Sequence, residues 1–179
     1  MALRKIVTEG DPILRKRARE VETVDHRIRS IFDDMVETMR EADGCGLAGP
    51  QVGLLKRLFV VEVPEPTANE EDESALEEAE DPPMMLLTLA NPQILEADGV
   101  QSGSEGCLSV PGYVGAVERP QRIKIRAINY ENQEVEIEAE GFLAVAISHE
   151  MDHLEGVLFT DKATDVKEIH SEEAEGEEA

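Results

Sequence analysis

The sequence predicts an α+β fold, in which antiparallel strands pack around one central, largely apolar helix and a second helix lies outside them near the N-terminus. Three observations predict this class. An N-terminal segment carries apolar residues at helical spacing, several later segments alternate apolar and polar residues, and an apolar C-terminal segment is long enough for a buried helix. With 179 residues, 41% hydrophobic and only 3% aromatic, the chain has the size of one domain with a mainly aliphatic core.

The first predicted element is a helix from about His26 to Glu41. Asp25 directly precedes it and can cap its N-terminus by accepting hydrogen bonds from free backbone N–H groups. The helix should end near Gly44 and Gly46, because glycines interrupt the helical pattern there. We interpret its apolar positions as one buried stripe, formed by Ile28, Ile31, Phe32, Met35 and Met39.

Strands are predicted in three later segments. Residues 54–63 are rich in β-branched and aliphatic side chains, and residues 84–95 have the same character, with Pro92 ending or bending the strand. Residues 122–139 alternate in two runs separated by "YENQE", which predicts a hairpin with one buried face. The inward-facing residues of that hairpin are expected to be Ile123, Ile125, Ala127, Val135, Ile137 and Ala139.

The central helix is predicted from Ala139 or Glu140 to Glu155, with Gly156 as its C-terminal cap. Its first half includes "FLAVAI", which is typical of a protein core. Its second half contains "HEMDH", with four ionisable residues in five positions. Because buried polar groups must be satisfied by partners, this half of the helix is expected to bind something.

The net charge of −23 lies mostly in two acidic runs. Residues 65–83 hold nine acids and residues 168–179 hold six, with no Lys or Arg in either run. The remainder has 25 acids against 17 bases, a net charge of about −8 that is ordinary for a folded domain. We therefore predict one domain over residues 1–165, interrupted by an acidic insert at 65–83 and followed by an acidic, disordered tail at 166–179.

The composition also limits the partners and the compartment. Phosphate contacts need Lys and Arg, so we expect no direct nucleic-acid binding. No apolar run of about 18 residues could span a membrane, and the start "MALRKIVTEGDP" lacks the apolar core of a signal peptide. The two cysteines, Cys45 and Cys107, do not require a disulfide framework. We expect the protein to remain in the cytoplasm, where it is made.

The segment "HEMDH" matches the pattern HExxH. In a helix, His149 and His153 lie one turn apart on one face, so both can bind a single metal ion while Glu150 reaches a metal-bound water. The alternative is a chance match in a surface helix, but a surface helix would not carry the apolar residues that precede the motif. Asp152 points off a different face, and we expect it to cap or to pair with an Arg.

A third protein ligand is expected, because catalytic zinc-type sites take three and leave one position for water. Cys107 is the candidate, since the glycines and proline of "SEGCLSVPG" predict a constrained loop or strand end. Nearby Glu105 could position a ligand by hydrogen bonding. A buried cysteine without a ligand role and a carboxylate ligand are the alternatives, whereas His26 and His170 lie in the outer helix and the acidic tail.

The segment "GCGLAGPQVG", residues 44–53, places glycines and a proline around Gln51. Glycines allow the backbone to approach other groups closely, and Gln51 offers an uncharged amide donor. From the residues alone, Gln51 either serves a site in this way or is exposed in a tight turn between the first helix and the strand that follows.

Together, "GCGLAGPQVG", "EGCLSVPG" and "ISHEMDHLEG" resemble, in this order, the three signature motifs of peptide deformylases. Secondary matches occur at "RKIVTEGDPILRKRA" and "ERPQRIKIRA", so the resemblance covers residues 3–162 and makes residues 1–165 a deformylase-like catalytic domain. The chain departs from the usual pattern at Gly49, where the family generally has Ala, and at Ser148, where it generally has Gln.

The resemblance implies one divalent metal ion, Fe²⁺ in the cell, for which Ni²⁺, Co²⁺ or Zn²⁺ can substitute. It implies Glu150 as general acid and base, with Gln51 and the backbone N–H of Leu108 stabilising the oxyanion. The implied metal ligands are Cys107, His149 and His153.

The implied reaction removes the formyl group from the N-terminal methionine of newly synthesised polypeptides and releases formate. Metal-bound hydroxide attacks the formyl carbon. The expected partners are formyl-methionyl nascent peptides and, transiently, the ribosome, although the acidic tail argues against docking through that segment. Two alternatives use the same HExxH pattern: a metallopeptidase that cuts internal peptide bonds, and a structural metal site in a binding module.

Specificity for methionine requires an apolar slot beside the metal. Phe142, Val145 and Ala146 lie seven, four and three residues before His149, so helix geometry places them on its face. We expect these three side chains to line the slot and assign Cys45 to packing, not to metal binding. The predicted substrate-binding residues are Cys45, Gly46, Phe142, Val145 and Ala146.

Overall fold

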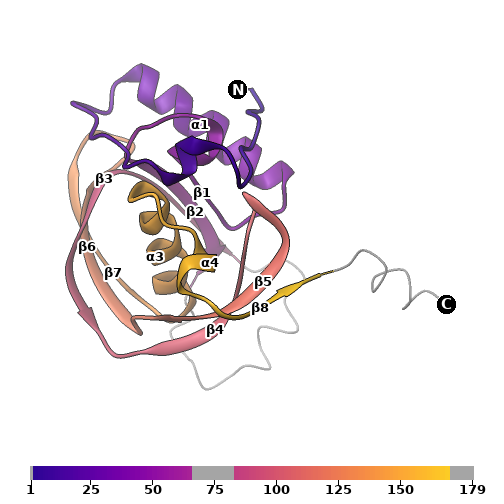
Figure 1. The fold of residues 1–179 in the computed structure, drawn as a ribbon. Coiled ribbons are helices and arrows are strands. Elements are labelled where there is room, and N and C mark those ends of the chain that lie inside the picture. The colour runs from indigo at the N-terminus through magenta and orange to yellow at the C-terminus, as the bar shows by residue number, and fades with distance from the viewer. Residues whose placement is uncertain (1, 66–82, 170–179) are drawn as a thin grey trace.

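The computed structural model describes residues 2–65 and 83–169 (Figure 1). Its helices are η1 (Pro12–Arg15), α1 (His26–Glu41), η2 (Gly49–Val52), α3 (Phe142–Leu154) and α4 (Phe159–Lys162). Its strands are β1 (Gly46–Ala48), β2 (Leu58–Pro64), β3 (Met84–Asp98), β4 (Gln101–Cys107), β5 (Val110–Arg119), β6 (Arg122–Ile128), β7 (Glu134–Glu140) and β8 (Thr164–Glu168). None of the helices in these two ranges is long and apolar enough to cross a membrane.

Two antiparallel sheets surround α3. In the described part of the chain, one sheet has the order β1-β2-β3-β6-β7 and the other the order β4-β5-β8. Figure 1 shows α3 within the curve of these strands and α1 outside, beyond β1 and β2. The predicted α+β class, with a central and an outer helix, is therefore confirmed.

The strand β2 separates two apolar clusters. Phe59 and Val61 pack in the cluster that contains the buried face of α3, whereas Leu58 and Val60 pack with the stripe of α1. Both faces of β2 are thus buried, which explains its nearly continuous apolar sequence "LFVV". Each fully buried Leu, Val or Phe side chain contributes roughly 2 kcal/mol to folding. The apolar contacts of α3 with β2 and with the other residues of its cluster therefore stabilise its position.

The helix α1 has the bounds that the sequence predicts. Asp25 caps it, because its Oδ1 accepts hydrogen bonds from the backbone N–H groups of Arg27 and Ile28, each at 3.0 Å. Four of the five predicted stripe residues are buried and Ile31 is partly buried. The amphipathic pattern therefore predicted both the element and its orientation.

The helix α3 begins later than predicted. Residues 139 and 140, which we assigned to the helix, belong to β7 and pair with Ile123 and Arg122 of β6. The ladder continues through this pair, and the chain then turns at Gly141, whose φ is 63°. At the other end, Gly156 has a φ of 75° and its N–H donates to the carbonyl of His153, as expected for a C-terminal cap.

Two strands differ in extent from their predictions. The strand predicted over residues 54–63 begins only at Leu58. The strand predicted over residues 84–95 extends to Asp98, and Pro92 bends it instead of ending it, at a register shift between Ala90 and Gln93. An irregularity of this kind accommodates Pro, which has no N–H for the ladder.

The first residues that we assigned to the tail form part of a strand. Residues 166–168 belong to β8, which pairs with β5, and the N–H of Ile169 donates to the carbonyl of Gly112 at 2.6 Å. The rest of the predicted tail, residues 170–179, lies outside the described residues, as do residues 66–82 of the predicted insert.

Candidate active site

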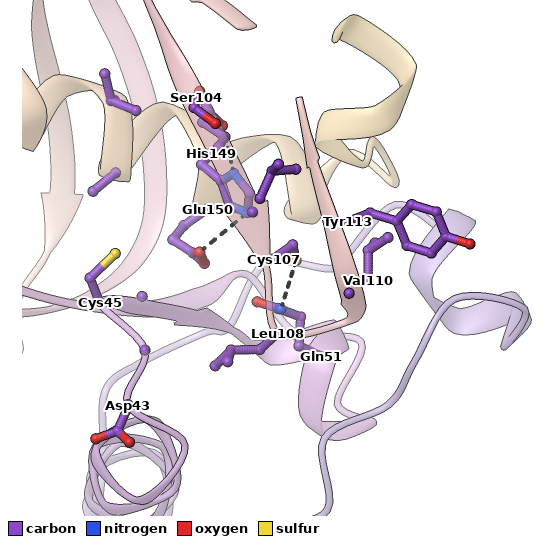
Figure 2. Close-up of a pocket in the computed structure, with 18 of the residues that line it drawn as sticks. Asp43, Cys45, Gln51, Ser104, Cys107, Leu108, Val110, Tyr113, His149 and Glu150 are labelled. Atoms are coloured by element: carbon purple, nitrogen blue, oxygen red, sulfur yellow. Dashed lines mark hydrogen bonds and ion pairs between the residues drawn. The ribbon is translucent and has the colours of Figure 1, made fainter. Parts of the chain in front are cut away.

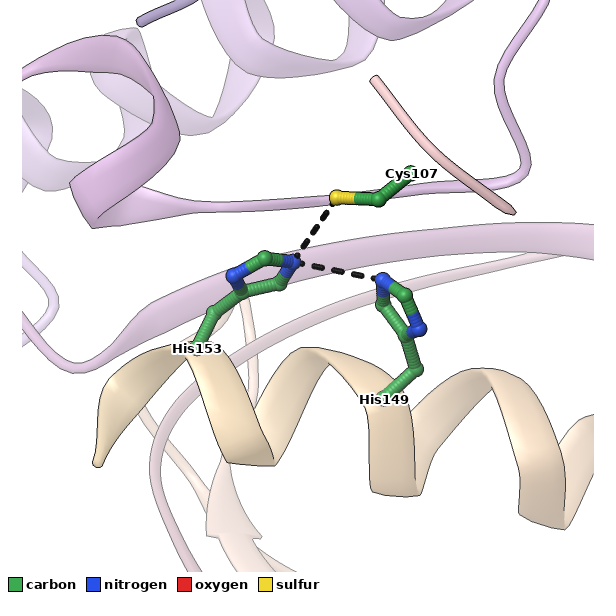
Figure 3. A group of neighbouring side chains, drawn as sticks. All are labelled: Cys107, His149 and His153. Atoms are coloured by element: carbon green, nitrogen blue, oxygen red, sulfur yellow. Dashed lines mark hydrogen bonds between the residues drawn. The ribbon is translucent and has the colours of Figure 1, made fainter. Parts of the chain in front are cut away.

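Three side chains that can bind metal converge at the C-terminal half of α3. His149 and His153 project from consecutive turns, and their Nε2 atoms lie 3.2 Å apart. Cys107 ends β4, where a two-residue turn leads into β5, and its Sγ lies 3.3 Å from Nε2 of His153. All three potential ligand atoms lie within 4.8 Å of one another (Figure 3). Residues distant in sequence thus form one cluster.

This donor set fits a divalent transition metal. One sulfur and two imidazole nitrogens are the ligands that zinc, iron, nickel and cobalt accept. The two histidines are nearly enclosed, with 11% of the His149 side chain and 1% of His153 exposed. Nε2 of His153 contacts only the other two potential ligands among the interactions described, Cys107 Sγ and His149 Nε2. Its Nδ1 has no hydrogen-bond partner within the described residues.

The charges around the two histidines differ. Burial lowers the pKa of His149, but Cys107, Glu105 and Glu150 outweigh burial and raise it to about 10. Burial, together with the positive charge of His149, lowers the pKa of His153 to about 3. At neutral pH, His149 is therefore protonated and His153 is neutral, so the pair carries one positive charge. A bound cation can supply positive charge in place of the proton on His149.

The orientation of His149 is set by a buried carboxylate. Oε1 of Glu105 lies 2.9 Å from Nδ1 of His149, leaving Nε2 directed at the cluster. Arg119 donates two hydrogen bonds to Glu105, at 2.8 and 2.9 Å, and a third to Asp152 at 2.5 Å. Burial would raise the pKa of Glu105, but Arg119 and His149 lower it to about 2. Glu105 and Asp152 thus have the kinds of partner that we anticipated.

Glu150 lies beside the cluster, and only 3% of the residue is exposed. Its Oε1 is 4.0 Å from Nε2 of His149, and its Oε2 has no partner within the described residues. Burial raises the pKa of Glu150 to about 7, although the charges of His149 and Arg119 oppose this effect. A Cβ on Gly46 would lie 2.9 Å from the Glu150 carboxyl carbon, so the absence of a side chain there leaves room for this acid.

Gln51 is buried in η2, with 1% exposure, which excludes the alternative of an exposed turn residue. Its Oε1 accepts a hydrogen bond from the Ala48 N–H at 2.9 Å. This contact directs the amide Nε2 toward Ser109 Oγ at 3.0 Å and Cys107 Sγ at 3.5 Å. The side-chain donor is therefore held next to the metal-ligand cluster.

A pocket of about 470 Å³ leads to this cluster (Figure 2). Gln51, Cys107, Leu108, His149 and Glu150 line it, whereas His153 lies deeper. Figure 2 shows Asp43 and Cys45 on one side and Val110 and Tyr113 on the other. All five residues that we predicted for substrate binding also line the pocket: Cys45, Gly46, Phe142, Val145 and Ala146.

The family model described as polypeptide deformylase matches residues 3–168. A peptide deformylase of Clostridium botulinum is 49% identical over 164 residues, which cover 92% of this chain and 99% of the relative. The chain belongs to the peptide deformylase family. A peptide deformylase of Alkaliphilus metalliredigens is 46% identical over 162 residues, covering 90% of this chain and 97% of the relative. The crystal structure of the Ehrlichia chaffeensis peptide deformylase in complex with actinonin has a TM-score of 0.79 at 39% identity, covering 92% of this chain and 91% of that chain.

The two departures from the deformylase motifs lie in different surroundings. A Cβ on Gly49 would lie 2.5 Å from the Lys56 carbonyl oxygen and 2.9 Å from that of Leu54, so the loop backbone packs directly against this glycine. Ser148 is 6% exposed, and its Oγ has no partner among the described residues. Neither residue lines the pocket.

The sequence did not single out several residues of the pocket wall. Those absent from the predicted lining include Asp43, Ser104, Val110, Tyr113, Val114 and Ile169. Ile169 lies in the segment interpreted as an acidic tail. In the sequence, Val166 and Ile169 are isolated apolar residues among charged ones, which is only a weak indication of a strand. Only the pairing of β8 with β5 places Ile169 at the pocket.

Proposed function

We propose that this deformylase hydrolyses the N-formyl group of formyl-methionyl nascent peptides in the cytoplasm and releases formate. The single observation that carries this proposal is the position of Glu150. It is a buried acid with one unpartnered oxygen among the described residues, next to three convergent metal ligands at the inner end of a pocket. This arrangement suits hydrolysis more than a structural metal site, which would need neither a free carboxylate nor open access.

Cys107, His149 and His153 would hold the metal, which we propose to be Fe²⁺. When bound, a divalent ion polarises water and the formyl oxygen, which lowers the barrier for hydrolysis. Glu105 holds Nδ1 of His149, so that the Nε2 lone pair of this ring is available to the metal. Thiolate and imidazole donors also accept Ni²⁺, Co²⁺ and Zn²⁺, which we expect to substitute.

Glu150 would take a proton from the attacking water and deliver it to the departing amine. A pKa of about 7 suits both halves of this transfer, because the carboxyl group can then gain and lose a proton near neutral pH. The Gln51 amide and the Leu108 backbone N–H would donate to the developing oxyanion. The fixed orientation of the Gln51 amide supports this role, since preorganised donors need not rearrange during the reaction.

The methionine side chain would occupy the apolar part of the pocket. Phe142, Val145 and Ala146 face it from α3, and Cys45 and Gly46 line it from the β1 end. We propose transient contact with the ribosome, because the substrates are nascent chains, and no direct binding to nucleic acid.

Formate release from formyl-Met-Ala-Ser by protein loaded with Fe²⁺, Ni²⁺ or Co²⁺ tests the proposal. We expect turnover with at least one of these metals, and none after Glu150→Gln in protein that still binds the metal. Absence of formate with all three metals would contradict the proposal. Cleavage of internal bonds in an unfolded protein, without formate release, would instead identify an HExxH metallopeptidase.

A further inference from the structure

A separate cavity of about 470 Å³ borders another face of α3. We call it the Ser148 cavity, after the serine that lines it from α3 together with Met151. Other parts of its wall come from β3, through Pro92 and Ile94, and from the short segment between β5 and β6, through Pro120. Among the described residues, none lines both this cavity and the active-site pocket, so a molecule bound here need not displace a peptide substrate.

An irregular part of β3 forms one wall of the Ser148 cavity. The pairing of β3 with β6 shifts register on both sides of Ile94, between Ala90 and Gln93 and between Ile94 and Glu96. Irregularities of this kind bend a strand and redirect its side chains. Ile94 is 49% exposed, and it lines the cavity together with the nearly buried Met151. These two side chains provide apolar surface that a ligand can cover.

Ser148 contributes an uncharged polar group without a partner. Only 6% of the residue is exposed, and its Oγ has no hydrogen-bond partner within the described residues. A hydroxyl group can both donate and accept, and buried polar groups in native proteins are almost always paired. The deformylase family generally has Gln at this position, so the shorter serine of this chain leaves room that a longer side chain would occupy.

Most of the charged side chains in the wall are already paired with one another. Arg57 pairs with Glu155 at 2.7 Å. Asp152 pairs with both Arg119 and Lys162, at 2.5 and 3.0 Å. A charged ligand would have to compete with these ion pairs, and breaking a buried pair is strongly unfavourable. An uncharged ligand leaves them intact.

The remaining charged residue of the described lining, Glu118, is exposed, so water solvates its carboxylate. We propose that the Ser148 cavity binds a small uncharged molecule, whose hydroxyl or amide group hydrogen-bonds to Ser148 and whose short apolar body covers Ile94 and Met151. Cavities of this size that combine apolar surface with a few polar groups are the usual form of small-molecule sites. This site does not depend on the proposed deformylase function, because it shares no described lining residue with the active-site pocket.

The test titrates the full-length, Zn²⁺-loaded chain with 4-methylpentanamide and follows the isotope-labelled methyl groups of Ile and Met by NMR. We expect saturable shifts at Ile94 and Met151 with a Kd of about 1–10 mM, as is typical of so small a ligand. Ile169 lines the active-site pocket and reports binding there, so its signals should not change.

Two further probes have the same apolar body and carry a charge. They are 4-methylpentanoate, which is negative, and 4-methylpentylammonium, which is positive. Each should bind at the Ser148 cavity more weakly than the amide by about fivefold or more, because a charge loses its hydration without gaining a free partner.

Two substitutions test the role of Ser148. Ser148→Ala removes the hydroxyl and should weaken amide binding about fivefold, the usual effect of one lost hydrogen bond. Ser148→Gln should fill part of the cavity and raise the Kd by about tenfold or more. The matched control is Ser104→Ala, because Ser104 lines the active-site pocket and not the Ser148 cavity, and its Kd should stay within about twofold of the wild type. Melting temperature and formate release verify that each variant is folded.

Four outcomes would overturn the site. They are an absence of saturable shifts at Ile94 and Met151, equal affinity for the three probes, an unchanged Kd in Ser148→Ala, and full binding in Ser148→Gln. The first outcome, with or without shifts at Ile169, would show that the cavity holds only solvent. The comparison of the three probes uses the wild-type chain, so it decides the question even where a variant does not fold.

Discussion

The two long helices, α1 and α3, differ in whether their buried polar side chains have hydrogen-bond partners. In α1, Asp34 and Thr38 are buried and accept hydrogen bonds from the backbone N–H groups of Ala2 and Arg4, at 2.8 and 2.9 Å. In α3, three buried side-chain atoms have no partner within residues 2–65 and 83–169: Ser148 Oγ, Glu150 Oε2 and His153 Nδ1. The one such atom in α1, within the same residues, belongs to the partly exposed Glu37.

This difference indicates that α3 contains buried groups that lower stability but serve the proposed function. A buried polar atom without a partner destabilises the fold by roughly 1–3 kcal/mol. In α1, Asp34 and Thr38 have hydrogen-bond partners within the protein. The unpartnered groups of α3 include the proposed acid and a proposed metal ligand. Changes in α3 should therefore impair activity more than stability, and changes in the core of α1 should do the reverse.

The largest effect is expected from Glu150→Gln in α3. The amide has nearly the same shape but cannot accept a proton, so kcat should fall about 10³-fold or more. Stability should stay the same or rise, because the variant no longer buries a carboxylate. Formate assays, metal analysis and urea unfolding check these expectations together. Loss of folding in this variant would show that Glu150 is structural and would contradict the contrast.

The next effect is expected from Phe32→Ala in α1. Phe32 is fully buried in the cluster between α1 and β2, and its removal should lower the free energy of unfolding by about 3–5 kcal/mol. Measured below its melting temperature, kcat should remain within about twofold of the wild type, because Phe32 does not line the pocket. A loss of kcat comparable to that of Glu150→Gln would remove the distinction between the helices.

An intermediate effect is expected in β1, which contacts both helices. Gly46→Ala introduces a Cβ 2.9 Å from the Glu150 carboxyl group, so the acid must move. We expect kcat to fall about tenfold, with a stability loss of about 1–2 kcal/mol from overpacking. Its neighbour Leu47 is fully buried in the α1 cluster, so Leu47→Ala should instead destabilise by about 2–5 kcal/mol and retain kcat. Measuring both the free energy of unfolding and kcat for Gly46→Ala and Leu47→Ala distinguishes the roles of the two residues.

Local patterns were sufficient to predict much of the fold and part of the candidate site. Asp25 and the apolar stripe after it identified the bounds of α1, because capping and periodicity act over a few residues. The spacing of His149 and His153 required that they share a face of α3. Cys107 lies 42 positions before His149, so its place beside the two histidines depends on the course of β4. The need for a third ligand made it a candidate, and the family resemblance then implied it as a metal ligand.

Other features depended on long-range pairing that no local pattern contains. The start of α3 is set by the pairing of Glu140 with Arg122 on β6, which favours the strand over the predicted helix. Arg119, which joins Glu105 to Asp152, could be anticipated only as an unspecified arginine partner. Ile169 reaches the pocket through pairing of β8 with β5, in a segment whose composition predicts disorder.

The smallest predicted effect concerns the ion pair between Arg40 of α1 and Glu62 of β2. Two hydrogen bonds, at 3.0 and 2.6 Å, join these side chains. They lower the pKa of Glu62, although burial opposes this shift. Arg40 is 56% exposed, so solvent screens the pair, and we expect a coupling of about 0.5–1 kcal/mol at pH 7.

A double-mutant cycle with Arg40→Gln and Glu62→Gln measures this coupling by urea unfolding. Because the folded-state pKa of Glu62 is lowered, its contribution is present above the ordinary value of 4.5 and is lost as the pH falls through the folded-state pKa. The coupling should therefore shrink as the pH decreases from 7 to below 4.5, while kcat at pH 7 stays within about twofold of the wild type. If the coupling persists undiminished in acid, it arises from packing and not from the Glu62 charge. If kcat at pH 7 instead falls in the Arg40→Gln or Glu62→Gln variant, the outer helix influences the active site. The separation of stability in α1 from activity in α3 is then weaker than the buried polar groups of the two helices indicate.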